Sequence, residues 1–166
     1  LGVGILATTL LAGRRLSDLH GGLIALAFVA VGAALRPETR AILIEVVSNP
    51  TTRVADVAGI AALARARGVA LVIDNTFASP VNFRPAEWWI DLSLHSGTKY
   101  LNGHSDLVAG AVIGKADLVR QITHRLNHLG GTLDPHACFL LHRGINADSR
   151  VMVQLPKLSE LVAVTW

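Results

Sequence analysis

The chain has 166 residues, of which 51% are hydrophobic and 16% charged, with a formal net charge of +3. This length suits one domain with a real core, and the composition excludes a disordered tail. No block of lysine and arginine stands out, which argues against nucleic-acid binding, because that function needs a clustered basic face. The single cysteine, Cys138, excludes a disulfide within the chain.

Two apolar stretches lie near the N-terminus, at residues 1–12 and 23–35. Neither reaches the roughly 18 to 20 residues that a membrane-spanning helix needs, so we expect no membrane partner. Low cysteine content is typical of the cytoplasm, where we place the protein. The mean hydropathy of +0.47 is high for a soluble monomer. It indicates either association with a membrane or a sheet-rich interior whose exposed apolar surface a partner covers.

A strand, a helix and a second strand are predicted in the first clearly patterned part of the chain. Residues 41–47 form a short apolar run that stops before Pro50, which predicts a buried strand. Residues 54–67 gather apolar side chains on one side and predict an amphipathic helix. Residues 69–73 predict the next strand. This order is that of a βαβ unit, in which the two strands are parallel.

The later elements are shorter. They are predicted as a loop at 75–89, strands at 91–95 and 108–113, a helix at 116–127, and a helix at 135–142 that ends near Gly144. No clear element is predicted after residue 146. The fold class is therefore α/β, a mostly parallel sheet with flanking helices.

Polar side chains follow three of the predicted strands. Asn49, Asp74 and Ser96 fall at or just past the strand ends. Because open parallel sheets bind ligands outside the carboxyl ends of their strands, we expect these side chains to converge on one rim. Lys99 lies three residues beyond Ser96, and Thr98 lies beside it.

A carboxylate at a strand end and a lysine flanked by hydroxyls suit pyridoxal 5'-phosphate (PLP). Lys99 can form a Schiff base with this cofactor, and Asp74 can pair with the pyridinium nitrogen, which keeps the ring an electron sink. The hydroxyls of Ser96 and Thr98 can donate hydrogen bonds to a phosphate.

Simpler interpretations of the same residues stay open at this point. Asp74 can cap the turn at its strand end through Asn75 and Thr76. Lys99 can be an ordinary solvated lysine, and the hydroxyls beside it can form local turns.

The segment Gly103-His104-Ser105-Asp106 contains residue types found in metal sites and catalytic triads, but it matches neither. One histidine and one aspartate two residues apart do not provide three metal ligands, so we predict no metal. Ser105 has no independent base in sight. A supporting role behind Lys99 is the better interpretation.

Six segments of the chain resemble the Cys/Met metabolism family of PLP-dependent enzymes, the cystathionine γ-synthase, γ-lyase and β-lyase group. They are residues 36–40, 45–50, 72–80, 96–106, 130–136 and 141–144. The segment around Lys99 is the most specific, and the spacing of twenty-five residues from Asp74 to Lys99 agrees with it.

The resemblance implies a role for each matching residue. Lys99 would be the catalytic residue, which holds PLP as a Schiff base and moves protons between the α-carbon and the β or γ positions. The cofactor-binding residues would be Asp74 at the pyridine nitrogen, Asn49 at the phenolic oxygen, Thr76 against the ring, and Ser96 and Thr98 at the phosphate, together with Lys99 itself.

The resemblance also implies a fold and a reaction. The fold would be a truncated large domain of a fold-type I, aspartate aminotransferase-like PLP enzyme. The reaction would be β- or γ-elimination or γ-replacement on small sulfur-containing or O-activated amino acids, as in trans-sulfuration and methionine biosynthesis. We further expect a homo-oligomer.

The chain also departs from the family. Family members are much longer, and residues 1–33 lack their upstream phosphate turn and ring-stacking aromatic. We therefore expect a fragment, with the PLP-binding core at 34–146 between an unassigned apolar segment at 1–33 and a divergent tail at 147–166. The alternative is a truncated, catalytically inactive remnant that acts as a binding or assembly module.

Overall fold

The computed structural model describes residues 29–151, and their side chains up to residue 147. Our expectations for residues 1–28 and 152–166 lie outside the described residues. Residues 29–34, which the sequence pattern left unassigned, are helical.

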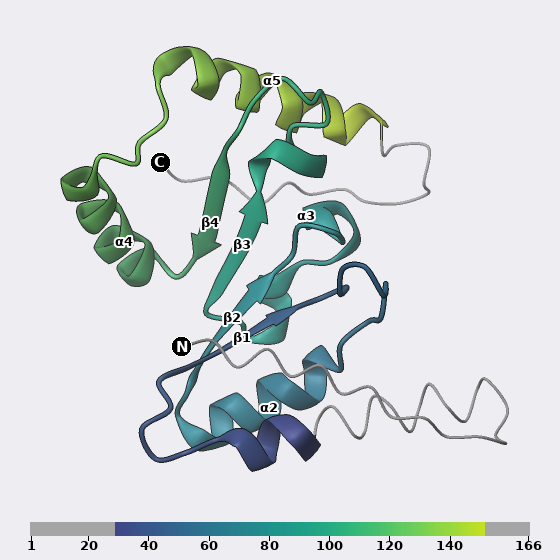
Figure 1. Cartoon of the computed structure of the whole chain (residues 1–166), viewed down its shortest axis with the longest axis vertical. Helices are drawn as coiled ribbons and strands as arrows, with labels where there is room; N and C mark the ends of the chain where they lie inside the picture. The colour runs from purple at the N-terminus through teal and green to yellow at the C-terminus, as the bar shows by residue number, and fades with distance from the viewer. Residues whose placement is uncertain (1–28, 152–166) are drawn as a thin grey trace, which may run out of the picture.

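Four strands form one sheet in the order β1-β2-β3-β4 (Figure 1). They are β1 Ala41–Glu45, β2 Ala70–Asp74, β3 Leu92–Ser96 and β4 Gly110–Gly114. β1, β2 and β3 are parallel, whereas β4 is antiparallel to β3. The predicted mostly parallel sheet is confirmed, and so is the parallel pairing of the first two strands.

Helix α2, Val57–Arg67, connects β1 to β2. It begins at Asp56, whose side chain accepts a hydrogen bond from the Gly59 N–H at 3.0 Å. It ends at Gly68, whose φ of 62° is a left-handed conformation that glycine adopts without steric cost. The capping aspartate and the final glycine explain why the predicted helix, 54–67, ends where the observed one does and begins within three residues of it.

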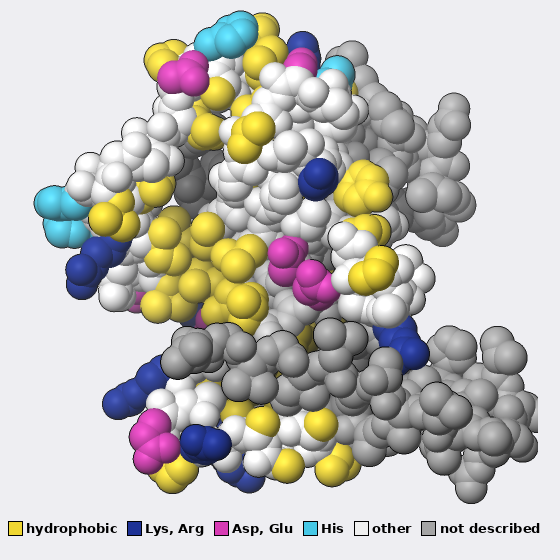
Figure 2. All heavy atoms as spheres, in the orientation of Figure 1, with side chains coloured by type: hydrophobic (Ala, Val, Ile, Leu, Met, Phe, Trp, Pro, Cys, Tyr) yellow, Lys and Arg dark blue, Asp and Glu magenta, His cyan; other side chains and the backbone are white. Residues whose placement is uncertain are grey.

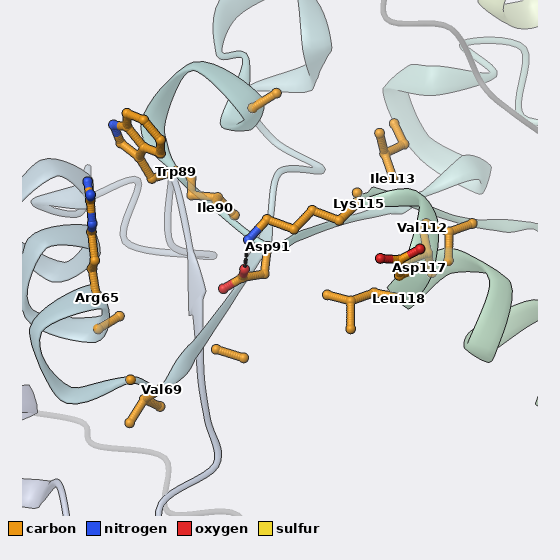
Figure 3. A pocket seen from close by; sticks show the side chains of 16 residues that line it. Arg65, Val69, Trp89, Ile90, Asp91, Val112, Ile113, Lys115, Asp117 and Leu118 are labelled. Carbon is orange, nitrogen blue, oxygen red and sulfur yellow. Dashed lines mark hydrogen bonds and ion pairs between the residues drawn. The ribbon is translucent and has the colours of Figure 1, made fainter.

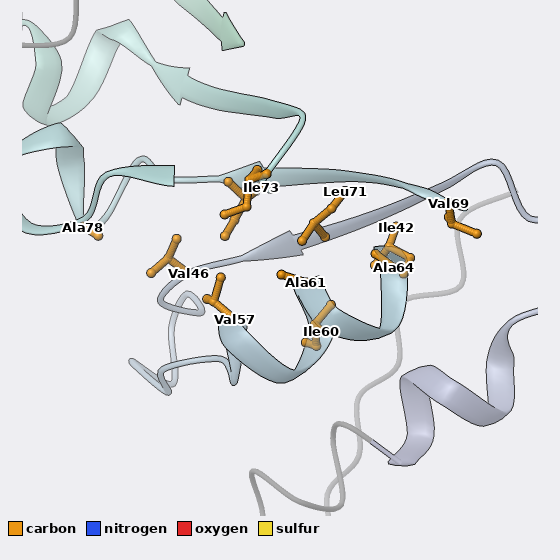
Figure 4. Close-up of a cluster of buried hydrophobic side chains, with 11 residues drawn as sticks. Ile42, Val46, Val57, Ile60, Ala61, Ala64, Val69, Leu71, Ile73 and Ala78 are labelled. Carbon is orange, nitrogen blue, oxygen red and sulfur yellow. The ribbon is translucent and has the colours of Figure 1, made fainter. Parts of the chain in front are cut away.

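The main hydrophobic core lies between α2 and one face of the sheet (Figure 4). Leu71 and Ile73 of β2 are 1% and 0% exposed and face Ile60 and Ala64 of the helix. Alternate residues of a strand face opposite sides, so the same alternation turns Asp74 to the other face.

The remaining elements surround the carboxyl and amino ends of the strands. They are α3 Ser79–Asn82, the 3-10 turn η1 Pro85–Trp88, the single turn η2 Gly97–Leu101, α4 Ala116–Leu129 and α5 Pro135–Val151.

Two predictions of local structure were wrong. The predicted loop at 75–89 contains α3 and η1, because Pro80 and Pro85 stand at the first turns of these short helices, where proline is tolerated. The last helix does not end near Gly144 but continues to Val151. Gly144 serves there as a packing site: a Cβ at this position would lie 2.4 Å from the Asn102 carbonyl oxygen.

The face of the sheet opposite α2 carries apolar side chains from all four strands. The strand register places Leu43, Val72, Leu94 and Val112 on it. Leu43 is 66% exposed and Val112 is 37% exposed. Figure 2 shows hydrophobic side chains gathered over β3 and β4 on the visible face. Among residues 29–151, no helix has the length and apolar character to cross a bilayer.

Candidate functional site

The structure brings Asp74, Ser96 and Lys99 to one edge of the sheet. Asp74 is the last residue of β2 and Ser96 is the last residue of β3. Asp74 is in register with Leu94, so Ser96, two residues further on, faces the same side of the sheet. Lys99 follows in the middle of η2, the short turn that begins directly after Ser96.

Thr76 connects the ends of the two strands. Its backbone N–H donates to Asp74 Oδ1 at 2.9 Å, and its Oγ1 accepts a hydrogen bond from the Ser96 N–H at 2.8 Å. The interpretation of Asp74 as the cap of its turn is therefore confirmed. This turn uses only one of the two carboxylate oxygens of Asp74, because Oδ2 makes no hydrogen bond to any residue in the described part of the chain.

Lys99 is exposed, and its Nζ forms neither a hydrogen bond nor an ion pair with any residue between 29 and 151. Its backbone (φ −95°, ψ −128°) is not helical and interrupts the turn of η2. Beside it, the Tyr100 ring meets the Phe77 ring edge-on, with 5.9 Å between ring centroids. This contact joins the lysine segment to the loop that follows Asp74.

Thr98 and Asn49 are placed differently from the other predicted site residues. Thr98 Oγ1 accepts a hydrogen bond from the Ala109 N–H at 3.1 Å and lies 3.4 Å from the Ala109 carbonyl oxygen. The Thr98 hydroxyl thus connects the η2 turn, which contains Lys99, to Ala109, the residue before β4. Asn49 is exposed, four residues beyond β1, and its backbone N–H donates to Glu45 Oε2 at 3.1 Å.

His95 is a buried polar residue near Asp74 that the sequence pattern does not single out. It is 4% exposed, and its Nε2 lies 3.0 Å from the Ser93 hydroxyl. Burial lowers the pKa of His95 to about 4, although the charge of Asp74 opposes the shift. The signal was the strand alternation: Ser93 is in register with the buried Ile73, so His95, two residues on, also faces inward.

Acidification from pH 6.5 to pH 4 is expected to remove up to about 3 kcal/mol of the free energy of unfolding through His95. The imidazole has a pKa of 6.5 when unfolded and about 4 when folded. Over this interval the unfolded chain therefore binds a proton that the folded chain does not, and the stability falls as the pH falls. Urea unfolding at several pH values measures the effect.

The variant His95→Gln is the control, since it keeps a polar side chain but cannot titrate. Its stability should change far less between pH 6.5 and pH 4. The carboxyls of Asp91, Asp106 and Asp134 accept hydrogen bonds that lower their pKa values, and they begin to affect the stability only near the ordinary value of 3.8. A His95→Gln variant with the same pH dependence as the wild type would contradict the assignment.

A groove of about 1020 Å³ lies elsewhere, between α2, the loop at Trp89, β4 and α4 (Figure 3). The ion pair between Lys115 Nζ and Asp91 Oδ1, 2.6 Å long, crosses it. The Arg65 guanidinium lies 4.8 Å from the centre of the Trp89 ring at its edge. None of the site residues predicted from the sequence lines this groove.

Comparison with known proteins decides the family. The family model described as "Cys/Met metabolism PLP-dependent enzyme" matches residues 25–154. The chain belongs to this family. The resemblance found in the sequence is confirmed, and the match extends beyond the segments that first carried it.

Three relatives show how much of the family the chain represents. It is 48% identical over 116 residues to a canavanine γ-lyase of Rhizobium leguminosarum bv. trifolii, covering 69% of this chain and 29% of the relative. It is 47% identical over 117 residues to the cystathionine γ-synthase of Escherichia coli, covering 70% and 30%. The crystal structure of a cystathionine γ-lyase from Lactobacillus plantarum, complexed with L-serine, matches with a TM-score of 0.71 and 41% identity, over 74% of this chain and 32% of that one.

The structural match confirms the predicted fold class, the mostly parallel α/β sheet of a fold-type I PLP enzyme. The chain spans about three tenths of the length of these relatives. Their family is PLP-dependent.

Proposed function

We propose that this chain is the PLP-binding core of an enzyme that performs β- or γ-elimination or γ-replacement on sulfur-containing or O-activated amino acids. The observation that carries the proposal is the shared edge of the sheet, where Asp74 ends β2 and the exposed Lys99 follows the end of β3. Membership of a PLP-dependent family supports it.

The residues present fit the cofactor. Asp74 has one carboxylate oxygen engaged by Thr76, which leaves Oδ2 for a ring nitrogen. Lys99 offers an amine that no residue in the described range neutralises, and Ser96 offers a hydroxyl on the same face as Asp74. Thr98 would contribute less to the phosphate than the sequence suggested, since its hydroxyl is shared with the Ala109 backbone.

Bound PLP supplies a ring that stabilises negative charge at the α-carbon of an amino acid. In the proposal, Lys99 would hold the cofactor through its Nζ and would accept the α-proton of the substrate. Asp74 would keep the ring nitrogen protonated, because a carboxylate favours the charged form of a nearby base. Thr76 would support both groups, since it joins Asp74 to the backbone of Ser96, three residues before Lys99.

The substrate class follows from the relatives. These include an L-methionine γ-lyase of Pseudomonas putida, 47% identical over 120 residues, as well as the cystathionine γ-synthase. We therefore propose substrates of the cystathionine, homocysteine or methionine type. Assembly as a homo-oligomer and action in the cytoplasm are parts of the same proposal.

Turnover by the purified chain tests the proposal. The full chain is mixed with PLP, its visible spectrum is recorded, and release of pyruvate or 2-oxobutyrate from L-cystathionine, L-methionine and an O-acylated homoserine is followed. We expect a visible band that borohydride removes, and one of these 2-oxo acids above the level given by a Lys99→Ala control. A chain with neither band nor product would contradict the proposal.

The open apolar face of the sheet favours a second candidate function. Leu43 and Val112 are exposed there, at 66% and 37%, in a chain that spans about three tenths of its relatives. A remnant of the PLP fold that binds another chain across this face would carry such a surface. A visible band without product in the turnover experiment would favour this binding or assembly module.

A further inference from the structure

A short polar bridge joins the segment after Lys99 to helix α5. Its centre is Asp106: Oδ1 accepts a hydrogen bond from Asn102 Nδ2 at 2.8 Å, and Oδ2 accepts one from the Arg143 guanidinium. Arg143 lies in α5, thirty-seven residues further along the chain. We name Asn102, Asp106 and Arg143 the Asp106 bridge.

Asn102 is the member of the bridge that reaches the lysine. It is 0% exposed, and its backbone N–H donates to the carbonyl oxygen of Lys99. The N–H of Gly103 donates to the same oxygen at 2.8 Å. The peptide group that follows Lys99 is therefore held by two consecutive residues, and any displacement of Asn102 moves the backbone of Lys99.

Apolar packing brings the two partners of the bridge together. Leu101 and Leu107, on either side of the turn, form a small buried cluster with Leu141 of α5. Gly144 of the same helix lies against the Asn102 backbone. Figure 1 shows α5 lying across the end of the sheet where β3 stops. This packing sets the distance that the side chains of Asp106 and Arg143 then span.

We propose that Asp106 and Arg143 are positioning residues, which hold the Lys99 turn against α5 and so present the lysine amine at the sheet edge beside Asp74. The presentation of the lysine amine to PLP rests on the proposed function, whereas the stabilisation of the Lys99 turn by the bridge does not. Hydrogen bonds from Asn102 and Arg143 hold the pKa of the Asp106 carboxyl below its ordinary value. The carboxylate is thus ionised at neutral pH, as the bridge requires.

Three variants of the full chain test the bridge. Asp106→Asn keeps the shape and removes the charge, Arg143→Gln removes the cation, and Arg143→Lys keeps the charge as the conservative variant. The matched controls are Asp117→Asn and Arg120→Gln, since these two residues form an exposed ion pair on α4. Far-UV circular dichroism establishes that each variant is folded.

The first readout needs no cofactor. Amide hydrogen exchange is measured by mass spectrometry on peptides covering residues 97–107, with residues 41–74 as the internal reference. We expect Asp106→Asn and Arg143→Gln to accelerate exchange in 97–107 about tenfold, a modest effect because the bridge is partly exposed. Arg143→Lys should restore most of the protection, and the α4 controls should match the wild type.

The second readout is the PLP concentration that gives half-maximal borohydride trapping at Lys99. We expect it to rise about tenfold in Asp106→Asn and Arg143→Gln and less than threefold in Arg143→Lys. Unchanged exchange in both charge-removing variants would overturn the proposal. Faster exchange with unchanged trapping would overturn the positioning role and leave a bridge that only stabilises the fold.

Failure of the proposed function is distinguishable from failure of the bridge. A wild-type chain that traps no PLP contradicts the proposed function. In that case, amide exchange in residues 97–107 still tests whether the Asp106 bridge stabilises the Lys99 turn. If one charge-removing variant does not fold, the other carries the test, and an Arg143→Lys chain that exchanges as fast as the folded charge-removing variant would contradict the proposal.

Discussion

Replacement of Lys99 by alanine is expected to abolish covalent capture of PLP while leaving the free energy of unfolding within about 0.5 kcal/mol of the wild type. The lysine side chain is exposed and makes no polar contact with the residues that the structure describes, so its removal costs no packing. Any turnover should fall by at least about a hundredfold, the lower end of what a positioned proton-transfer group contributes. Visible absorbance and urea unfolding measure the two effects.

Lys115 provides the matched control. It is also an exposed lysine, and its ion pair with Asp91 lies in the groove at the opposite end of the strands. Lys115→Ala should capture PLP like the wild type. Equal loss of capture in both variants would mean that general surface amines react with the aldehyde, and would contradict the special role of Lys99.

Replacement of Gly144 by alanine is expected to lower the free energy of unfolding by about 2 kcal/mol. A Cβ at this position would lie 2.4 Å from the Asn102 carbonyl oxygen and 2.5 Å from its Cα. These are backbone atoms that cannot swing aside, so α5 or the lysine turn must shift, at about 1–3 kcal/mol for overpacking. Better helix propensity returns at most about 1 kcal/mol. Chemical denaturation measures the difference.

Gly32 is the control for the Gly144 variant. It is also a helical glycine, but the nearest atom to its added Cβ is Leu63 Cδ2 at 3.8 Å, an ordinary contact. Gly32→Ala should be neutral or slightly stabilising. A Gly144→Ala chain as stable as Gly32→Ala would show that α5 does not pack against Asn102 as described.

The sequence predicted the helices and strands whose bounds depend on neighbouring residues, such as helix caps and short apolar runs. The helix at α2 has a capping aspartate and a left-handed glycine at its ends, and the strand at β2 is a short apolar run that ends in a carboxylate. The order of strands and helix then predicted the parallel pairing, which placed Asp74 and Ser96 on one edge. None of these steps needed a contact between distant residues.

The features that the sequence pattern missed depend on contacts between distant residues. Thr76 and Ser96 are twenty residues apart and meet only because β2 and β3 pair in a particular register. The glycine at 144 is typical of a helix end, but its packing against Asn102 lets α5 continue. The hydroxyl of Thr98 is engaged by Ala109, eleven residues away. Spacing along the chain carries no signal for such contacts.

The location of the PLP adduct in the wild-type chain tests the role of Lys99 most directly. The purified chain is incubated with PLP, reduced with borohydride, digested and mapped by mass spectrometry. We predict one dominant pyridoxyl adduct, on Lys99, because this exposed amine follows the end of β3, at the edge of the sheet where Asp74 ends β2. An adduct spread equally over Lys99 and Lys115, or absent from Lys99, would contradict it.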